Sequence, residues 1–292
     1  MTDVPALDAL RARLRLGPLE RFPDGSLPVY AAGEHLALKL YPPEDAAEAD
    51  TETTVLRVLE RRLSVPTPAI VDTGAHEGWR YVLMRRLSGE HLDDVWPRLS
   101  ATERLELAGR LGAVLAELHA VTDPAIATLG PRDWSTFVAA QRASAADRQR
   151  ELGLGEDWLA RIPGFLARVD LGTPPRVLLH TEFLREHLLL THDGTRWTVT
   201  GLLDFEPAMR GAAEYEFVAV GIHLAGGDRA FLRRLLLSYG YSSGDLGEAL
   251  AHRLLAYTLL HRYGNLRGYL ERLPAPPRPT LEALSVTWFG AS

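Results

Sequence analysis

The 292-residue chain is long enough for one large domain or for two lobes that share a cleft, and its composition is that of a globular protein. No apolar run approaches the roughly 20 residues of a membrane-spanning helix. The first 16 residues suggest a short amphipathic helix rather than a signal peptide. The arginines are scattered and the net charge is −6, which argues against nucleic-acid binding. The absence of cysteine excludes disulfides, thiolate zinc sites and cysteine nucleophiles. From these features together we expect a cytoplasmic protein without a membrane or nucleic-acid partner.

The N-terminal third of the chain is predicted to be rich in β-structure. Apolar runs separated by turns predict five short strands, over residues 19–22, 29–31, 35–41, 70–71 and 79–84. A tight turn is expected at Pro23-Asp24-Gly25-Ser26, between the first two strands. Apolar residues at helical spacing predict one helix from about residue 45 to 63, and the prolines that follow must end it.

Helices are expected to dominate the rest of the chain. A capping box at Ser100 and Glu103 opens one helix, and two more are expected over residues 228–239 and 245–263. The exception is a hairpin with a turn at Asp193-Gly194, built from short apolar runs at residues 177–179, 188–190 and 197–203. We therefore expect an α+β chain with a small β-rich lobe over residues 1–87, a larger helical lobe with an embedded hairpin over 88–292, and a ligand-binding cleft between them.

The residues that flank this hairpin carry the chemistry. His180, Glu182 and His187 precede one of its strands and Asp204 follows the other, so we expect the hairpin to bring them together. Two carboxylates and an imidazole suit magnesium-assisted phosphoryl transfer, which needs metal ligands and an acceptor for a hydroxyl proton. The H-x-E spacing also suggests a zinc deaminase, but that motif requires a later cysteine pair that this chain lacks.

The motif H-T-E-x-x-x-x-H followed by L-D-F resembles the aminoglycoside phosphotransferase and choline kinase family, whose signature is H-G-D-x-x-x-x-N followed by I-D-F or I-D-W. The resemblance implies a two-lobed protein-kinase-like fold. It makes Glu182 the catalytic base, Asp204 and His187 the ligands of Mg²⁺, and His180 a residue that supports the loop. Glutamate and histidine here replace the family's aspartate and asparagine.

The resemblance extends over the N-terminal lobe, where it implies a nucleotide site. Lys39 is the only lysine among 32 basic residues, and it matches the strand lysine that binds the nucleotide phosphates, with Glu52 as its ion-pair partner. The residues expected to bind the nucleotide are Ser26, Lys39, Glu52, Arg85 and Leu87, with Arg85 and Leu87 acting through the backbone at the hinge. Glu216 is expected to support the catalytic loop, and Glu206 and Arg185 to contact the substrate.

The implied function is transfer of the γ-phosphate of ATP or GTP to a hydroxyl of a small molecule. The composition is typical of GC-rich genomes, such as those of antibiotic-producing actinobacteria. The family resemblance then suggests an antibiotic acceptor, either an aminoglycoside or a nucleoside antibiotic such as capuramycin, and hence resistance. The alternatives are a metabolic small-molecule kinase and an inactive nucleotide-binding pseudokinase. The choice between ATP and GTP and the oligomeric state stay open at this point.

Overall fold

A computed structural model describes residues 5–23 and 25–291, so Asp24 of the predicted turn lies outside the described residues. The chain divides into two compact units. The first comprises Met1–Val95, Thr122–Ala127 and Glu186–Ala208, and the second comprises Trp96–Val121, Thr128–Arg185 and Met209–Ser292. The predicted hairpin therefore groups with the β-rich N-terminal segment, while the lobe boundary at residue 87 stays a prediction.

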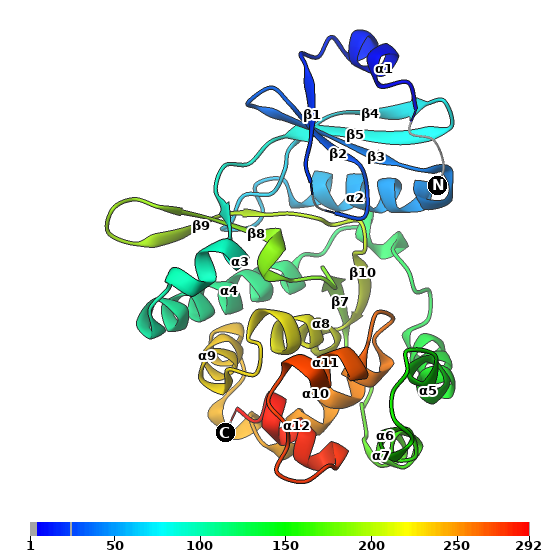
Figure 1. The fold of residues 1–292 in the computed structure, drawn as a ribbon, viewed down its shortest axis with the longest axis vertical. Coiled ribbons are helices and arrows are strands. Elements are labelled where there is room, and N and C mark those ends of the chain that lie inside the picture. Colours follow the sequence, from blue (N-terminus) through cyan, green and yellow to red (C-terminus); the bar gives the residue numbers. More distant parts are fainter. Residues whose placement is uncertain (1–4, 24, 292) are drawn as a thin grey trace. The chain divides into compact units, whose positions relative to one another are not determined.

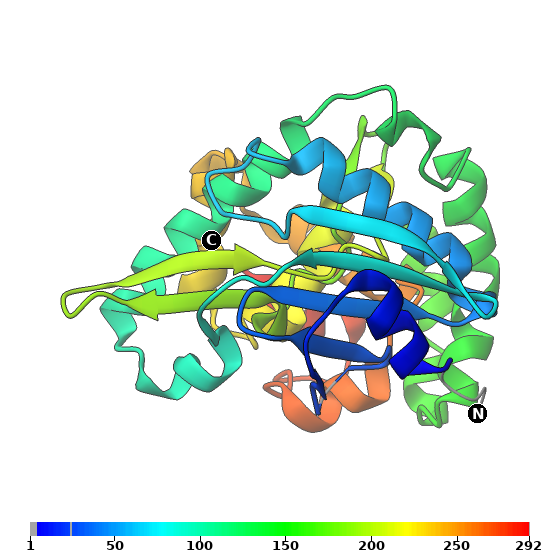
Figure 2. The same ribbon diagram turned by 90° about the horizontal axis from the view of Figure 1, so that it is seen from above.

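A five-stranded antiparallel sheet forms the centre of the first unit, and its strands lie side by side in Figures 1 and 2. Their order is β1-β2-β3-β5-β4. The strands are β1 (Leu19–Arg21), β2 (Val29–Ala32), β3 (Leu36–Tyr41), β4 (Ile70–His76) and β5 (Trp79–Arg85). All five were predicted, although β4 is longer than expected because it continues to the turn before β5.

The two faces of this sheet bury different residues because side chains alternate along a strand. Leu38 and Leu40 of β3 pack in one cluster with Leu10 of helix α1 (Leu7–Leu14). Tyr41 packs in another cluster with Ala49 of helix α2 (Ala46–Leu59). Lys39 therefore shares its face of the sheet with α2, which is the helix that carries Glu52.

The hairpin consists of β8 (Leu188–His192) and β9 (Trp197–Leu202), and β6 (Glu90–His91) joins its edge. Its turn forms as the Asp-Gly pair predicted, with the Asp193 carboxylate accepting hydrogen bonds from the backbone N–H groups of Thr195 and Arg196. The hydrogen bond from the Thr195 hydroxyl, together with these backbone bonds, holds the pKa of Asp193 well below its usual range. The open end of the hairpin closes where Leu203 N–H donates to His187 O at 2.9 Å.

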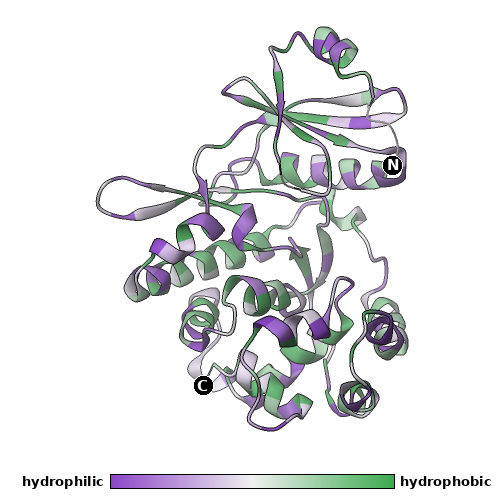
Figure 3. Ribbon diagram, viewed as in Figure 1, coloured by the Kyte–Doolittle hydropathy of each residue, from purple (hydrophilic) through white to green (hydrophobic). Residues whose placement is uncertain are grey.

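Helices make up most of the second unit, and Figure 3 shows hydrophobic and hydrophilic residues alternating along them. They are α4 (Ala101–Ala120), α5 (Trp134–Glu151), α6 (Glu156–Leu159), α7 (Ile162–Arg168), α8 (Ala213–Ala219), α9 (Arg229–Tyr239), α10 (Glu248–Leu260), α11 (Leu266–Arg272) and α12 (Leu281–Phe289), with a π-helical turn over Val220–Leu224. Helices α4 and α9 pack closely: a Cβ at Gly112 would lie 2.2 Å from Leu235 O, so only glycine fits there.

Helix positions follow the prediction better than helix lengths do. The Ser100–Glu103 capping box opens α4 as expected. Helix α2 ends at Leu59 rather than near residue 63, because the chain turns at Arg61, which has φ 59°. The first of the predicted apolar runs, β7 (Arg176–Leu179), pairs with the unpredicted β10 (Met209–Ala212) and not with the hairpin.

The expected fold class is confirmed: the chain is α+β, with a β-rich N-terminal region, a helical C-terminal region and an embedded hairpin. In the part of the chain that the structure describes, no helix is both long enough and apolar enough to cross a bilayer.

Candidate active site

Lys39 lies at the centre of a group of carboxylates in the first unit. Its Nζ is 3.3 Å from Glu52 Oε2 and also contacts Asp204 Oδ1 and Glu206 Oε2. Lys39 and Glu52 are buried, and Asp204 and Glu206 are half-buried. The structure thus brings together the lysine and glutamate that the sequence analysis paired, and adds Glu206 to them.

Glu52 is held in place by more than the ammonium group. Its Oε1 accepts a hydrogen bond from Phe205 N–H at 3.2 Å, and its Oε2 accepts one from the Tyr41 hydroxyl. Phe205 directly follows Asp204, whose φ of 71° turns the chain sharply after β9. Helix α2 therefore fixes both Lys39 and the segment that carries Asp204.

The charges in this group do not balance. Carboxylate oxygens of Glu52, Asp204 and Glu206 lie within 4.8 Å of one another around a single ammonium. Burial acts to lower the pKa of Lys39, but the carboxylates of Glu52 and Asp204 hold it well above its ordinary value. Burial and the neighbouring Asp204 raise the pKa of Glu206, because a second buried carboxylate is costly to ionise there. A cation would relieve this excess of negative charge.

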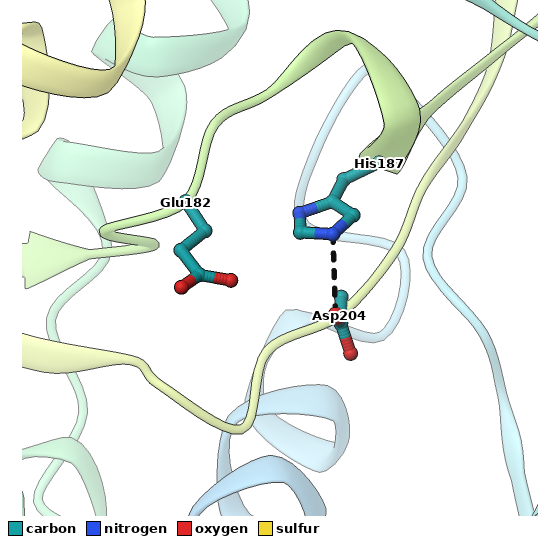
Figure 4. A group of neighbouring side chains, drawn as sticks. All are labelled: Glu182, His187 and Asp204. Carbon is teal, nitrogen blue, oxygen red and sulfur yellow. Dashed lines mark ion pairs between the residues drawn. The ribbon is translucent and has the colours of Figure 1, made fainter. Parts of the chain in front are cut away.

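His187 supplies a further donor beside Asp204. Its Nε2 is 3.2 Å from Asp204 Oδ2, the ion pair drawn as a dashed line in Figure 4. Two ligand atoms at adjacent octahedral positions, each about 2.1 Å from an ion, lie about 3.0 Å apart. The two side chains are thus already spaced as neighbouring ligands of one ion. Oxygen and imidazole donors together with surplus negative charge fit a divalent cation, so the donor set is compatible with the expected Mg²⁺.

Glu182 lies in the second unit, on the loop that follows β7. Its backbone N–H donates to His180 Nδ1 at 3.3 Å, and the preceding Thr181 has φ 71°, an unusual value for a β-branched residue. Because Glu182 and Asp204 belong to different units, their predicted convergence stays a prediction.

Glu216 of α8 anchors this loop. Its fully buried carboxylate accepts hydrogen bonds from the backbone N–H groups of His180, at 2.6 Å, and Thr181, at 3.0 Å. His119 Nε2 lies 3.7 Å from the same carboxylate, and His119 Nδ1 is 2.9 Å from the Tyr239 hydroxyl. Burial alone would raise the pKa of Glu216, but His119 and the loop lower it, which favours the ionised carboxylate. These contacts match the supporting role that the sequence suggested for Glu216.

The structure also shows the contacts or the exposure of the other predicted site residues. Arg185 does not extend freely: its Nε donates to Leu224 O at 2.8 Å, and its guanidinium lies 3.6 Å from the centre of the Trp96 ring. The backbone N–H of Arg85 donates to Ala69 O at 2.8 Å within the sheet. Ser26 is exposed between β1 and β2, and Leu87 is half-buried after β5.

The sequence analysis missed Tyr41 and Tyr239. Tyr41 follows Lys39 by two residues, so strand alternation could have placed it on the same face. Tyr239 is 120 residues from its partner His119, and nothing local in the sequence connects the two.

Comparison with known proteins adds family-level information. A family model described as "Phosphotransferase enzyme family" matches residues 18–255. Among solved structures, the chain is similar to the GDP complex of wild-type aminoglycoside 2'-phosphotransferase-IIIa, with a TM-score of 0.73 and 19% identity over 87% of each chain. It is also similar to the gentamicin complex of APH(2")-IIa, with a TM-score of 0.66 and 18% identity over 97% of this chain and 99% of the other.

A third similar structure is an aminoglycoside-3'-phosphotransferase of type VIII, with a TM-score of 0.61 and 23% identity over 87% of this chain and 97% of the other. At such identities the likeness establishes the fold, and the predicted kinase-like fold is confirmed.

Proposed function

Because the chain belongs to the phosphotransferase enzyme family, we propose that it transfers the γ-phosphate of a nucleoside triphosphate to a hydroxyl of a small molecule. Family membership confirms the prediction of an enzyme that moves a phosphate group. The observation that carries the rest of the proposal is the Lys39 group, in which one ammonium is surrounded by three carboxylates. Structures similar to this chain were solved with GDP, ADP or ATP, which supports a nucleotide as the phosphate donor.

In the first unit, Lys39 binds phosphate oxygens of the nucleotide while Glu52 holds the ammonium in place. Ser26 and the backbone near Arg85 and Leu87 contact the rest of the nucleotide. Asp204, His187 and Glu206 hold Mg²⁺, so we assign Glu206 to the metal rather than to the substrate. The bound ion would neutralise charge on the transferred phosphoryl group and orient it.

In the second unit, Glu182 accepts the proton of the acceptor hydroxyl. As the hydroxyl oxygen bonds to the γ-phosphorus, the bond from that phosphorus to the bridging oxygen breaks and a nucleoside diphosphate leaves. Glu216 and His180 position the loop that carries Glu182. Glu182 stands where the family signature has aspartate, so its side chain is longer by one methylene.

The acceptor class is a finer part of the proposal. Similar structures were solved with kanamycin, streptomycin and gentamicin, which supports an antibiotic acceptor, and a nucleoside antibiotic such as capuramycin fits the same chemistry. We place the enzyme in the cytoplasm, where nucleoside triphosphates are available. A metabolic small-molecule kinase would use the same residues.

The test is a γ-phosphate transfer assay with ATP and GTP in parallel, with Mg²⁺ or Mn²⁺, against a panel of hydroxylated antibiotics and metabolites. We expect phosphate transfer to at least one compound, with loss of transfer in Asp204→Asn. Nucleotide binding without transfer to any compound, and without slow hydrolysis of the nucleotide, would instead identify a pseudokinase.

A further inference from the structure

Tyr41 lies on the same face of strand β3 as Lys39, because the two residues are two positions apart. The side chain is fully buried, and its ring packs in one cluster with Ala49 of α2. Lys39 Nζ lies 5.4 Å from the centre of this ring. The hydroxyl group has a different role from the ring, since it donates a hydrogen bond to the carboxylate of Glu52.

The Glu52 carboxylate has a hydrogen-bond donor for each of its oxygens besides Lys39. Its Oε2 accepts from the Tyr41 hydroxyl, and its Oε1 accepts from Phe205 N–H at 3.2 Å. Burial, followed by the charge of Glu52, raises the pKa of Tyr41 well above its ordinary value, so the hydroxyl keeps its proton and acts as the donor. A buried carboxylate without such partners would be costly. Glu52 is therefore stabilised by contacts that do not depend on the ammonium.

The ion pair between Lys39 and Glu52 is a loose one. Its atoms, Lys39 Nζ and Glu52 Oε2, are 3.3 Å apart, whereas a charge-assisted hydrogen bond measures about 2.7–2.9 Å. The same ammonium lies closer to Asp204 Oδ1 and Glu206 Oε2. On the proposed function, these two carboxylates bind Mg²⁺ and the ammonium binds phosphate oxygens. The pair with Glu52 must then be weak enough to leave the ammonium available.

We infer that Tyr41 is a positioning residue for the nucleotide, whose hydroxyl keeps the Glu52 carboxylate in place and paired while Lys39 binds phosphate. Without the hydroxyl, Oε2 of Glu52 would have to take its hydrogen bond from Lys39. The ion pair would tighten, and transfer of the ammonium to phosphate oxygens would leave a buried carboxylate short of a donor. Nucleotide affinity would fall for both reasons. The inference rests on the proposed function, because that function makes Lys39 the residue that binds phosphate.

Lys39 is the only lysine of the chain, so lysine labelled with ¹³C and ¹⁵N gives NMR signals from this side chain alone. The full chain is titrated with non-hydrolysable analogues of ATP and GTP in parallel, with Mg²⁺ present. Tyr41→Phe removes the hydroxyl and keeps the ring, and thus the packing against Ala49 and Lys39. We expect this variant to shift the Lys39 signals before any nucleotide is added, and to raise the nucleotide Kd roughly tenfold.

Tyr81→Phe is the matched control. Tyr81 lies on the neighbouring strand β5, and its hydroxyl also donates to a carboxylate, that of Asp72, at 2.9 Å. It packs in the cluster of Leu10, on the other face of the sheet, so its loss should change neither the Lys39 signals nor the nucleotide Kd. A second check places Tyr41→Phe in a Glu52→Gln background. There it should raise the Kd less than about twofold further, because the amide carries no charge for the hydroxyl to share.

Three results would each overturn the inference: Lys39 signals and a Kd that do not change in Tyr41→Phe, an equal effect of Tyr81→Phe, or an undiminished effect in the Glu52→Gln background. The native chain tests the proposed function separately. If neither analogue perturbs its Lys39 signals, the proposed function fails and the inference fails with it. If an analogue does perturb them and Tyr41→Phe binds that analogue as tightly as the native chain, only the inference fails.

Discussion

The side chains around Lys39 in the first unit and those around Thr181 in the second unit are held in place by different kinds of contact. The first group has three carboxylates and one ammonium, and it is largely buried. The second group is a loop that carries the proposed base Glu182, and the buried carboxylate of Glu216 accepts hydrogen bonds from its backbone amides. Buried charge of one sign is costly unless a partner balances it. The contrast indicates a cation as the missing partner of the first group, while hydrogen bonds to Glu216 position the loop of the second group.

The strongest way to break this comparison is to remove the carboxylate that would bind the cation. Asp204→Ala should lower phosphate transfer by about 10³-fold, because Asp204 is the residue proposed to hold the metal and it also lies against His187. Stability should change little, since Lys39 keeps Glu52 and Glu206. Turnover and urea unfolding measured on the same preparation check both expectations, and full activity in the variant would refute the metal assignment.

Removing the ammonium should affect both stability and binding. Lys39→Met leaves three neighbouring carboxylates without their cation, so we expect a loss of about 3–5 kcal/mol in the free energy of unfolding. Nucleotide affinity should fall as well. Lys39→Arg keeps the charge but replaces a compact ammonium with a planar guanidinium, so it should restore more of the stability than of the activity. Equal recovery of both would show that only the charge of Lys39 matters.

In the second unit the corresponding test is the loop anchor. Glu216→Gln keeps the size of the side chain but turns an N–H₂ group toward the backbone N–H groups of His180 and Thr181. A displaced loop should lower kcat by about 10²-fold while nucleotide affinity stays the same. Glu214→Gln on the same helix is the matched control, because Glu214 pairs with Arg253 and does not contact the loop amides in the described residues. A similar loss in both variants would indicate general damage to α8.

The same substitution predicts a change in acid stability. The folded-state pKa of Glu216 lies below its ordinary value of 4.5, so its contribution to stability is present above pH 4.5 and is lost as the pH falls through the folded pKa. The stability difference between the native chain and Glu216→Gln should therefore shrink below pH 4.5. Denaturant unfolding at a series of pH values measures it, and a constant difference would mean that Glu216 is not ionised in the folded chain.

The comparison also explains what the sequence could predict. The family resemblance implied the pairing of Lys39 with Glu52, which strand alternation and one helix make possible, and the approach of His187 to Asp204 follows from an Asp-Gly hairpin turn. These are relations between residues near in sequence or linked by a turn. The contact of His119 with Tyr239 and the approach of Arg185 and Arg272 to His223 depend on how distant helices pack. A single sequence gives no local pattern for such packing, and β10, with no apolar alternation, was missed for a related reason.

The smallest expected effect concerns the identity of the cation. An imidazole ligand favours first-row transition metals over Mg²⁺, which prefers oxygen. His187→Asn, which restores the residue of the family signature, should lower the ratio of Mn²⁺ to Mg²⁺ affinity about tenfold, equivalent to about 1.4 kcal/mol. Mn²⁺ binding followed by electron paramagnetic resonance, with Mg²⁺ as competitor, measures this ratio without relying on turnover. His192→Asn, an exposed position on the same hairpin, is the control and should leave the ratio unchanged. An unchanged ratio in His187→Asn would mean that His187 only orients Asp204 through their 3.2 Å contact, and the cation in the first unit would then be held by oxygen ligands alone.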